Sequence, residues 1–210
     1  MYQHFSPNML KTFEQCPRKF DYKYLQGISM PVNDDIFEFG KNIHALASYY
    51  LRNEFIDKLE KSLNPKEYDV WMYLKNSIYF SYEVVNTEYN LSVKVGDFYF
   101  GGRLDALVKD NDRYYILDYK TGSAPEGAKY DYQTMIYILA VKEFFKTDNI
   151  KFVYIDLKNR EEVSVEFNSE SDKEYREKLI SISNKINAFE TAPKKENCNC
   201  EYEKICYWYK

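Results

Sequence analysis

The sequence predicts an α/β protein in which a mixed central β-sheet is flanked by helices, and three observations lead to this class. Apolar residues recur at helical spacing through most of the first ninety residues. Alternating segments rich in β-branched and aromatic residues follow, first between 91 and 120 and again between 152 and 167. Helical patterns stand between and after these strands, which is the order expected of a mixed sheet covered by helices.

The first helices are expected at the N-terminus. Ser6 and Pro7 supply an N-cap and a proline at the first helical position. The short helix that they begin is expected to end near Cys16 and to restart at Pro17, because proline cannot continue a helix but is tolerated in its first turn.

Two longer helical patterns complete the N-terminal region. From Asp34 to about Leu59 the apolar positions follow the helical period. These positions are Ile36, Phe39, Ile43, Ala47, Tyr50, Leu51 and Phe55. Pro65 opens a second pattern that continues through Trp71 to Tyr82, so the first ninety residues are expected to be mostly helical.

The rest of the chain alternates strands and helices. In chain order, the expected segments are strands at 91–95, 98–109 and 113–120, a helix at 130–146, strands at 152–157 and 163–167, and a helix at 172–188. No repeat, Gly/Ser linker or long block of charge marks a boundary, so residues 1–210 are expected to form one domain. Within it, 1–90 would be the helical region, 91–170 the sheet core and 171–210 a terminal helix with a cysteine cluster.

Composition and charge exclude several classes of protein. With 45 % hydrophobic and 30 % charged residues, the chain is neither collagen-like nor disordered. No apolar stretch approaches the roughly 20 residues of a membrane span, and residues 1–19 lack the apolar core of a signal peptide, so we expect a cytoplasmic protein that does not enter a membrane. The net charge of −4 argues mildly against a polyanion partner.

Two carboxylates are expected to converge in the hairpin that follows residue 98. Residues two apart share a face of a strand, so Asp118 and Lys120 point the same way, as do Arg103 and Asp105. If residues 111–112 form a two-residue turn, Asp105 lies opposite Asp118 and Arg103 opposite Lys120. Opposed carboxylates repel each other and need a counter-charge. A divalent cation could supply it, and so could the two basic side chains in a salt-bridge ladder.

Three further side chains are candidates for the same site. His44 lies four residues after Gly40 on a predicted amphipathic helix, where a histidine is either a ligand or a hydrogen-bonded residue at the helix boundary. Gln133 and Tyr137 are four apart on another predicted helix and therefore share one face. They could present an amide and a phenol to a strand or a nucleotide, or they could be a structural pair.

Taken together, these residues form four short motifs in a fixed order. The motifs are Gly40-x-x-x-His44, Gly102-Arg103-x-Asp105, Asp118-Tyr119-Lys120-Thr121-Gly122 and Gln133-x-x-x-Tyr137. In this order and at these intervals they resemble the PD-(D/E)XK nuclease superfamily, specifically its RecB-like branch. The pattern of spaced residues from Ser6 to Phe20 and the C-terminal cysteines resemble the iron-sulfur subgroup, which includes CRISPR adaptation exonucleases and AddB-type nuclease domains.

The resemblance implies a restriction-endonuclease-like core and a role for each matching position. The implied metal ligands are His44, Asp105, Asp118 and the carbonyl of Tyr119, for a catalytic Mg²⁺ or Mn²⁺. Lys120 is implied to position or activate the attacking water. Gln133 and Tyr137 match a further motif of the branch and complete the implied catalytic set.

The four cysteines are Cys16, Cys198, Cys200 and Cys206. Disulfides are not expected in a reducing compartment. The resemblance implies a 4Fe-4S cluster that ties Cys16 to the end of the chain and so joins both termini. The subgroup's distal cysteines commonly follow C-x-x-C-x5-C, whereas one residue fewer separates Cys198 from Cys200 here. Zinc and free thiols therefore stay open as alternatives.

The implied function is a metal-dependent deoxyribonuclease, acting as an exonuclease on single-stranded DNA or DNA ends in repair, recombination or CRISPR adaptation. DNA is the implied partner, with a helicase or a CRISPR integration protein as a candidate protein partner. No phosphate-binding G-x-x-x-x-G-K-[ST] motif occurs, so unwinding would need another protein. The alternative is a catalytically silent subunit that binds DNA or protein and keeps the cluster as a structural element.

Overall fold

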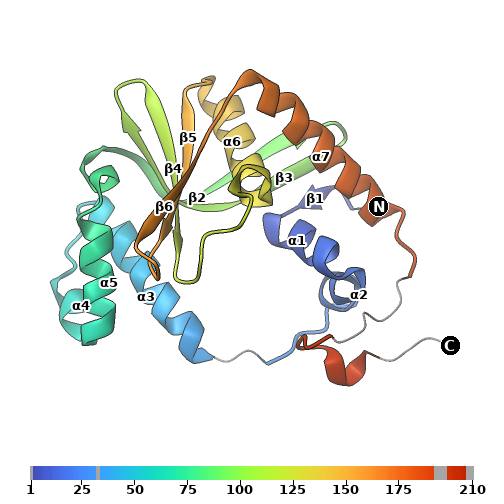
Figure 1. The fold of residues 1–210 in the computed structure, drawn as a ribbon, viewed down its shortest axis with the longest axis horizontal. Helices are drawn as coiled ribbons and strands as arrows, with labels where there is room; N and C mark the ends of the chain where they lie inside the picture. The colour runs from blue at the N-terminus through green and yellow to red at the C-terminus, as the bar shows by residue number, and fades with distance from the viewer. Residues whose placement is uncertain (1, 32–33, 192–197, 207–210) are drawn as a thin grey trace.

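A computed structural model describes residues 2–31, 34–191 and 198–206 of the chain, without the side chains of 34–37 (Figure 1). Its strands are β1 (His4–Phe5), β2 (Glu83–Val95), β3 (Phe98–Asp110), β4 (Arg113–Lys120), β5 (Ile150–Asp156) and β6 (Glu161–Glu166). Its α-helices are α1 (Pro7–Gln15), α2 (Pro17–Phe20), α3 (Asp34–Leu51), α4 (Asp57–Ser62), α5 (Pro65–Lys75), α6 (Tyr132–Phe145) and α7 (Ser169–Asn187). The short turns are η1 (Asp21–Leu25), η2 (Ile78–Ser81), η3 (Ala128–Tyr130) and η4 (Glu203–Ile205).

The six described strands form one mixed sheet, as the sequence predicts. β2 pairs antiparallel with β3 along nearly its whole length, while β1 and β4 share the other edge of β3. β5 runs parallel to β4, with α6 as the crossover helix that a parallel pair requires, and β6 closes the sheet antiparallel to β5. Because β1 pairs only near Tyr99 and β4 only from Ala106 onward, the edge of β3 between them has no neighbouring strand.

The hairpin between β3 and β4 has the predicted register as far as its strands are paired, but the pairing ends before the expected pairs Asp105–Asp118 and Arg103–Lys120. Its pairs run from Ala106 opposite Leu117 to Asp110 opposite Arg113. The turn residue Asn111 has a φ of 52°, a left-handed conformation that asparagine tolerates better than most residues. The predicted turn chemistry at 111–112 therefore fixes the pairing of the two strands that carry the central motifs.

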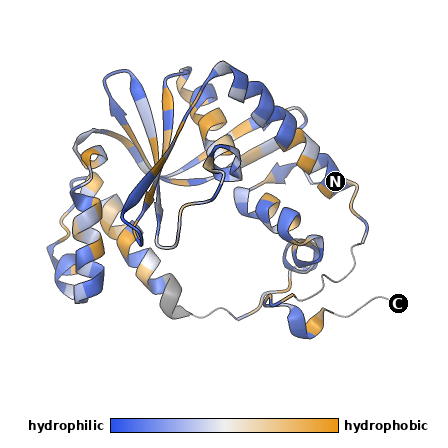
Figure 2. Cartoon of the chain, viewed as in Figure 1, coloured by the Kyte–Doolittle hydropathy of each residue, from blue (hydrophilic) through white to orange (hydrophobic). Residues whose placement is uncertain are grey.

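Helices cover both faces of the sheet and enclose two hydrophobic cores (Figure 1). α1, α6 and α7 pack on one face, and α3 and α5 pack on the other. Residues 134–141 of α6 are all buried, because this helix lies between the sheet and α7 and is hydrophobic on nearly every side (Figure 2). On the opposite face, Trp71 of α5 is completely buried and holds that helix against α3.

The N-terminal region differs from the expected run of helices in its strand content. β2 begins at Glu83 rather than Leu91, so eight residues expected to be helical or irregular extend the sheet by pairing with β3. β1 adds two more strand residues near the N-terminus. The sheet core therefore reaches into the range 1–90 that was assigned to helices.

The two long helical patterns also end earlier than expected. α3 ends at Leu51 and α4 begins only at Asp57, because Asn53 takes a left-handed φ of 56° and breaks the helix. The pattern from Pro65 ends as α5 at Lys75, and the short turn η2 leads from there into β2. In the described part of the chain, no helix is both long and apolar enough to cross a bilayer.

The C-terminal segment lies against the segment that follows α2. Tyr22 and Tyr202 stack with ring centroids 5.5 Å apart, and the Tyr202 hydroxyl donates to the Ile28 carbonyl at 2.8 Å. Lys19 forms an ion pair with Glu201 at 2.9 Å. The two ends of the described chain are thus joined, as expected, but by aromatic, hydrogen-bond and ionic contacts.

Candidate active site

The predicted site residues gather at the open edge of β3, between β1 and β4. A cavity of about 820 Å³ lies there. The cavity is lined by Asn8, Gly40, Lys41, His44, Ala45, Ser48, Tyr49, Arg52, Glu88, Arg103, Asp105, Lys120 and Thr121. Residues of the first three motifs line this cavity. Gln133 and Tyr137 of the fourth motif do not line it, but they form hydrogen bonds with Lys120 and Arg103, which do.

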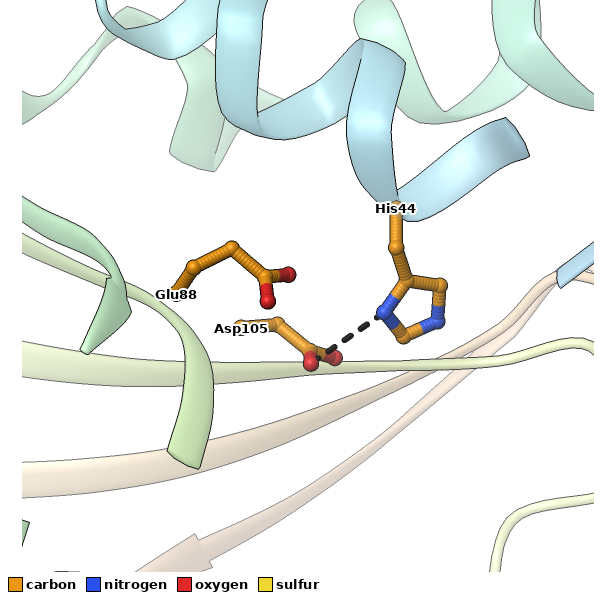
Figure 3. Close-up of side chains that lie close together, drawn as sticks. All are labelled: His44, Glu88 and Asp105. Carbon is orange, nitrogen blue, oxygen red and sulfur yellow. Dashed lines mark ion pairs between the residues drawn. The ribbon is translucent and has the colours of Figure 1, made fainter. Parts of the chain in front are cut away.

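His44 projects from α3 between two groups of the sheet. Its Nδ1 lies 3.2 Å from Oδ1 of Asp105 (Figure 3). Its Nε2 lies 3.1 Å from the carbonyl oxygen of Tyr119. Burial disfavours the imidazolium, but the hydrogen bond and charge of Asp105 outweigh it and raise the pKa of His44. Both ring nitrogens face acceptors, which agrees with a raised pKa.

Asp105 marks the place where β3 and β4 separate. The last strand pair is Ala106 with Leu117, and two residues after Leu117 the Tyr119 amide donates to Oδ2 of Asp105 at 2.7 Å instead of to a β3 carbonyl. The side chain thus takes the place of a ladder hydrogen bond. This exchange leaves Oδ1 free to contact His44 and turns the carboxylate toward the cavity.

Glu88 is a site residue that sequence reasoning missed. It lies in β2 directly across from Asp105, between the pairs Thr87–Ala106 and Tyr89–Leu104. Its φ of 49° is unusual for a strand residue other than glycine and is costly unless the surroundings hold it. One potential ligand atom each from Glu88, Asp105 and His44 lie within 4.8 Å of one another (Figure 3).

Asp118 and Lys120 form a separate polar group with Gln133. Lys120 Nζ lies 2.7 Å from Oδ2 of Asp118 and donates to Oε1 of Gln133 at 2.8 Å, while Nε2 of Gln133 donates to Oδ1 of Asp118 at 3.0 Å. Burial, together with the negative charge of Asp105, raises the pKa of Asp118 to about 6 against the opposing effect of Lys120. The carboxylate of Asp118 is therefore affected by the negative charge of Asp105, but its ion pair is with Lys120.

Tyr137 contacts the backbone of β3 next to the cavity. Its hydroxyl donates to the carbonyl of Arg103 at 3.0 Å and so satisfies a backbone group on the open edge of β3. A Cβ at Gly102 would lie only 2.7 Å from this hydroxyl, so glycine is required for the approach. Within the described chain Tyr137 thus contacts the backbone of the glycine-arginine motif rather than the cavity.

The predicted ligands divide between these groups. Asp105, His44 and the Tyr119 carbonyl lie together, with the imidazole between the carbonyl and the carboxylate. Asp118 is outside the group of ligand atoms that His44, Asp105 and Glu88 form. The common ligand set suggested by the motifs is therefore only partly assembled, and Glu88 joins it.

The four cysteines do not form a comparable group. Among the described residues, the only set of three or more His, Cys, Asp or Glu side chains close enough to hold a metal is His44, Glu88 and Asp105. Cys206 is buried and the other three cysteines are half-buried. Burial, with a hydrogen bond to Cys198, raises the pKa of Cys200. The thiol arrangement thus does not fit a four-ligand cluster.

Comparison with known proteins agrees with this fold. The family model described as "PD-(D/E)XK nuclease superfamily" matches residues 4–207, and the chain belongs to that superfamily. A solved structure from Eubacterium rectale, provisionally described as an exonuclease, shares the fold with a TM-score of 0.63 and 11 % identity, over 99 % of this chain and 90 % of that one.

A second solved structure, SSO0001, has a TM-score of 0.46 and 15 % identity, over 98 % of this chain and 86 % of that one. No curated protein sequence matches the chain.

The group formed by His44, Glu88 and Asp105 has donors suited to a divalent cation. Carboxylate oxygens are the preferred ligands of Mg²⁺ and Mn²⁺, and imidazole suits transition metals. The potential ligand atoms of the three side chains lie within 4.8 Å of one another. The two carboxylates and the imidazole could therefore hold such a cation, provided that the His44 nitrogen facing Asp105 gives up its proton, because a metal-binding imidazole must be neutral.

We expect Glu88→Gln to weaken Mn²⁺ binding at least about tenfold, because the amide keeps the shape of the side chain but removes one negative ligand. Isothermal titration calorimetry with Mn²⁺ measures this change. Glu83→Gln is the matched control, since Glu83 lies exposed on the same strand and outside the site. An unchanged dissociation constant for Glu88→Gln would remove Glu88 from the ligand set.

Proposed function

We propose that this protein is a metal-dependent DNA nuclease that hydrolyses phosphodiester bonds. The observation that carries the proposal is the convergence, at one cavity, of a possible cation site at His44, Glu88 and Asp105 with the ammonium group of Lys120. Such a combination suits phosphoryl chemistry, in which negative charge on the phosphate must be neutralised and a water molecule must be activated.

The proposal assigns one role to the bound cation and another to Lys120. When bound, a divalent cation lowers the pKa of water and withdraws charge from the phosphate. Lys120 is held by Asp118 and Gln133, so its ammonium group keeps a fixed position and can orient the attacking water and stabilise charge developing on the phosphate oxygens. As the bond from water to phosphorus forms, the bond to the leaving oxygen breaks; the water gives up one proton to solvent, and the leaving oxygen takes up one proton from solvent, so the step balances.

The proposed branch, substrate and pathway rest on the sequence motifs. They support an exonuclease of the RecB-like branch that acts on single-stranded DNA or DNA ends, in the cytoplasm, in repair, recombination or CRISPR adaptation. A helicase or a CRISPR integration protein is the proposed protein partner. The family match and the provisional description of the Eubacterium rectale protein are in keeping with a nuclease, and they leave substrate and pathway to experiment.

Cleavage of end-labelled DNA tests the proposal directly. Purified protein is incubated with single-stranded, blunt duplex and circular substrates in Mg²⁺, in Mn²⁺ and in excess chelator. The proposal predicts cleavage that requires metal and produces short fragments from free ends. Binding without cleavage in either metal would overturn it in favour of the silent DNA-binding subunit.

A metal centre at the four cysteines, as a 4Fe-4S cluster with zinc as the alternative, is a separate proposal. The sequence pattern supports it, and so do the contacts that bring the C-terminal segment to the residues after α2. The thiols do not fit the centre as they are arranged, so binding would require them to move together. No catalytic step is attributed to this centre.

If the cysteine proposal holds, we expect anaerobically purified protein to be brown and to contain iron. Cys16→Ser should then lower the melting temperature as much as Cys206→Ser, because both ligands would close the same loop. Metal analysis and thermal denaturation measure these outcomes. Zinc without iron would replace the cluster, whereas no metal and a Cys16→Ser protein as stable as wild type would exclude both.

A further inference from the structure

One face of the β2–β3 ribbon leads away from the candidate active site. Beyond the facing residues Glu88 and Asp105, the pairs on this face are Asn90–Arg103, Ser92–Gly101 and Lys94–Tyr99. The side chains of all these residues except the glycine are exposed, whereas the alternate positions such as Val93 and Phe100 are buried. At about 3.3 Å per residue, this exposed strip extends about 20 Å from Asp105 to Tyr99.

The strip ends at an aromatic platform. β1 places His4 beside Tyr99, and the two rings stack with centroids 5.0 Å apart and an interplanar angle of 12°. Tyr99 keeps 39 % of its surface exposed, and Lys94 Nζ lies 5.7 Å from the centre of its ring. His4 thus covers one face of the Tyr99 ring and the exposed side chain of Lys94 lies over the ring, so a base that stacks on Tyr99 would displace the lysine toward a phosphate.

A groove connects the platform with the site. A cavity of about 430 Å³ is lined by His4, Tyr99 and further residues of β1, β2, β3 and the start of α1. It adjoins the active-site cavity, because Gly102 lines the first and Arg103 the second. Arg103 lines the active-site cavity; it is ion-paired with Glu88 at 2.9 Å and keeps 64 % of its side chain exposed.

We propose that this groove binds single-stranded DNA on one side of the bond to be cleaved. Arg103 and Lys94 contact successive phosphates, and one unpaired base stacks on the platform of His4 and Tyr99. Aromatic stacking with flanking positive charge is how proteins bind single strands without sequence preference. A duplex keeps its bases stacked inside and cannot use the platform, so the groove selects single strands or frayed ends.

This inference rests on the proposed function for the identity of its ligand, but its test needs no cleavage. Binding of a labelled oligothymidylate is measured by fluorescence anisotropy in excess chelator. We expect Tyr99→Ala to weaken binding by about 5- to 150-fold, which corresponds to the loss of one stacked base. Tyr99→Phe should restore most of it, and Lys94→Ala should lower the dependence of affinity on salt.

Two controls separate stacking from general damage. Tyr68→Ala removes another exposed tyrosine, 48 % exposed against 39 % for Tyr99, from α5 outside the groove and should leave binding unchanged. Moving a single abasic site along the oligonucleotide should weaken binding by the wild type at one position. At that position the Tyr99→Ala protein should lose nothing further, because the stacking partner is already gone.

The outcomes distinguish the inference from the proposed function. Wild-type affinity in Tyr99→Ala, or an abasic penalty that is the same at every position, overturns the groove while leaving cleavage to be judged separately. Loss of binding in Tyr99→Ala with no cleavage by the wild type supports the groove and overturns the nuclease. Failure of Tyr99→Phe to recover binding would assign the tyrosine a hydroxyl contact and overturn the stacking platform.

Discussion

Asp105→Asn and Lys120→Ala are each expected to lower the rate of DNA cleavage at least about a hundredfold. Asp105 is the only described side chain that contacts both His44 and the amide of Tyr119, and its charge would be a direct ligand contribution. Lys120 carries the positive charge that two other side chains hold in place. Single-turnover rates on end-labelled single strands in saturating Mn²⁺ measure both losses.

The matched control for these variants is Asp110→Asn. Asp110 lies exposed at the far end of the same strand as Asp105, so its replacement changes the same charge without reaching the cavity. Melting temperatures show whether each variant keeps its fold. A cleavage rate near that of wild type in folded Asp105→Asn would contradict the proposed chemistry.

Trp71→Ala is expected to reduce the free energy of unfolding by about 3–5 kcal/mol, the usual cost of truncating a buried aromatic residue. Trp71 is fully buried, packs edge-on against Tyr50 of α3 at 5.7 Å and donates to Glu60 at 2.6 Å. The loss is large against the 5–15 kcal/mol that typically stabilises a domain. Urea denaturation measures it.

Two variants calibrate this second result. Trp71→Phe keeps much of the packing and loses the hydrogen bond to Glu60, so its cost should be clearly smaller. Tyr68→Ala, on the exposed side of the same helix, should change stability by less than about 0.5 kcal/mol. A loss below about 1 kcal/mol in Trp71→Ala would show that α5 does not hold α3, and therefore His44, in position.

The parts of the site that sequence predicted well are those fixed by local rules. The alternation of residues in β3 and β4 and the turn at 111–112 determine one register, and the structure has it. Helix spacing likewise places Gln133 toward the sheet, where it contacts Asp118 and Lys120. These features depend on residues close in sequence, which short-range patterns describe.

The missed features depend on tertiary context. Glu88 was not recognised because its segment lacks regular alternation, and a left-handed residue inside a strand leaves no pattern in the sequence. β1 is only two residues long, too short to show a period. The helical pattern through Phe55 was misleading because that residue is 80 % exposed and follows the break at Asn53.

The placement of the charged groups along the chain has a consequence for the order of folding. Glu88, Asp105, Asp118 and Lys120 all belong to the meander of β2, β3 and β4, whose strands are joined by tight turns at 96–97 and 111–112. Closing such short loops costs little entropy and is fast. We therefore expect the acidic groups to be brought together early in folding, while water still screens their repulsion. His44 must close a longer loop, so we expect its helix to dock later, onto strands that already carry the acidic groups.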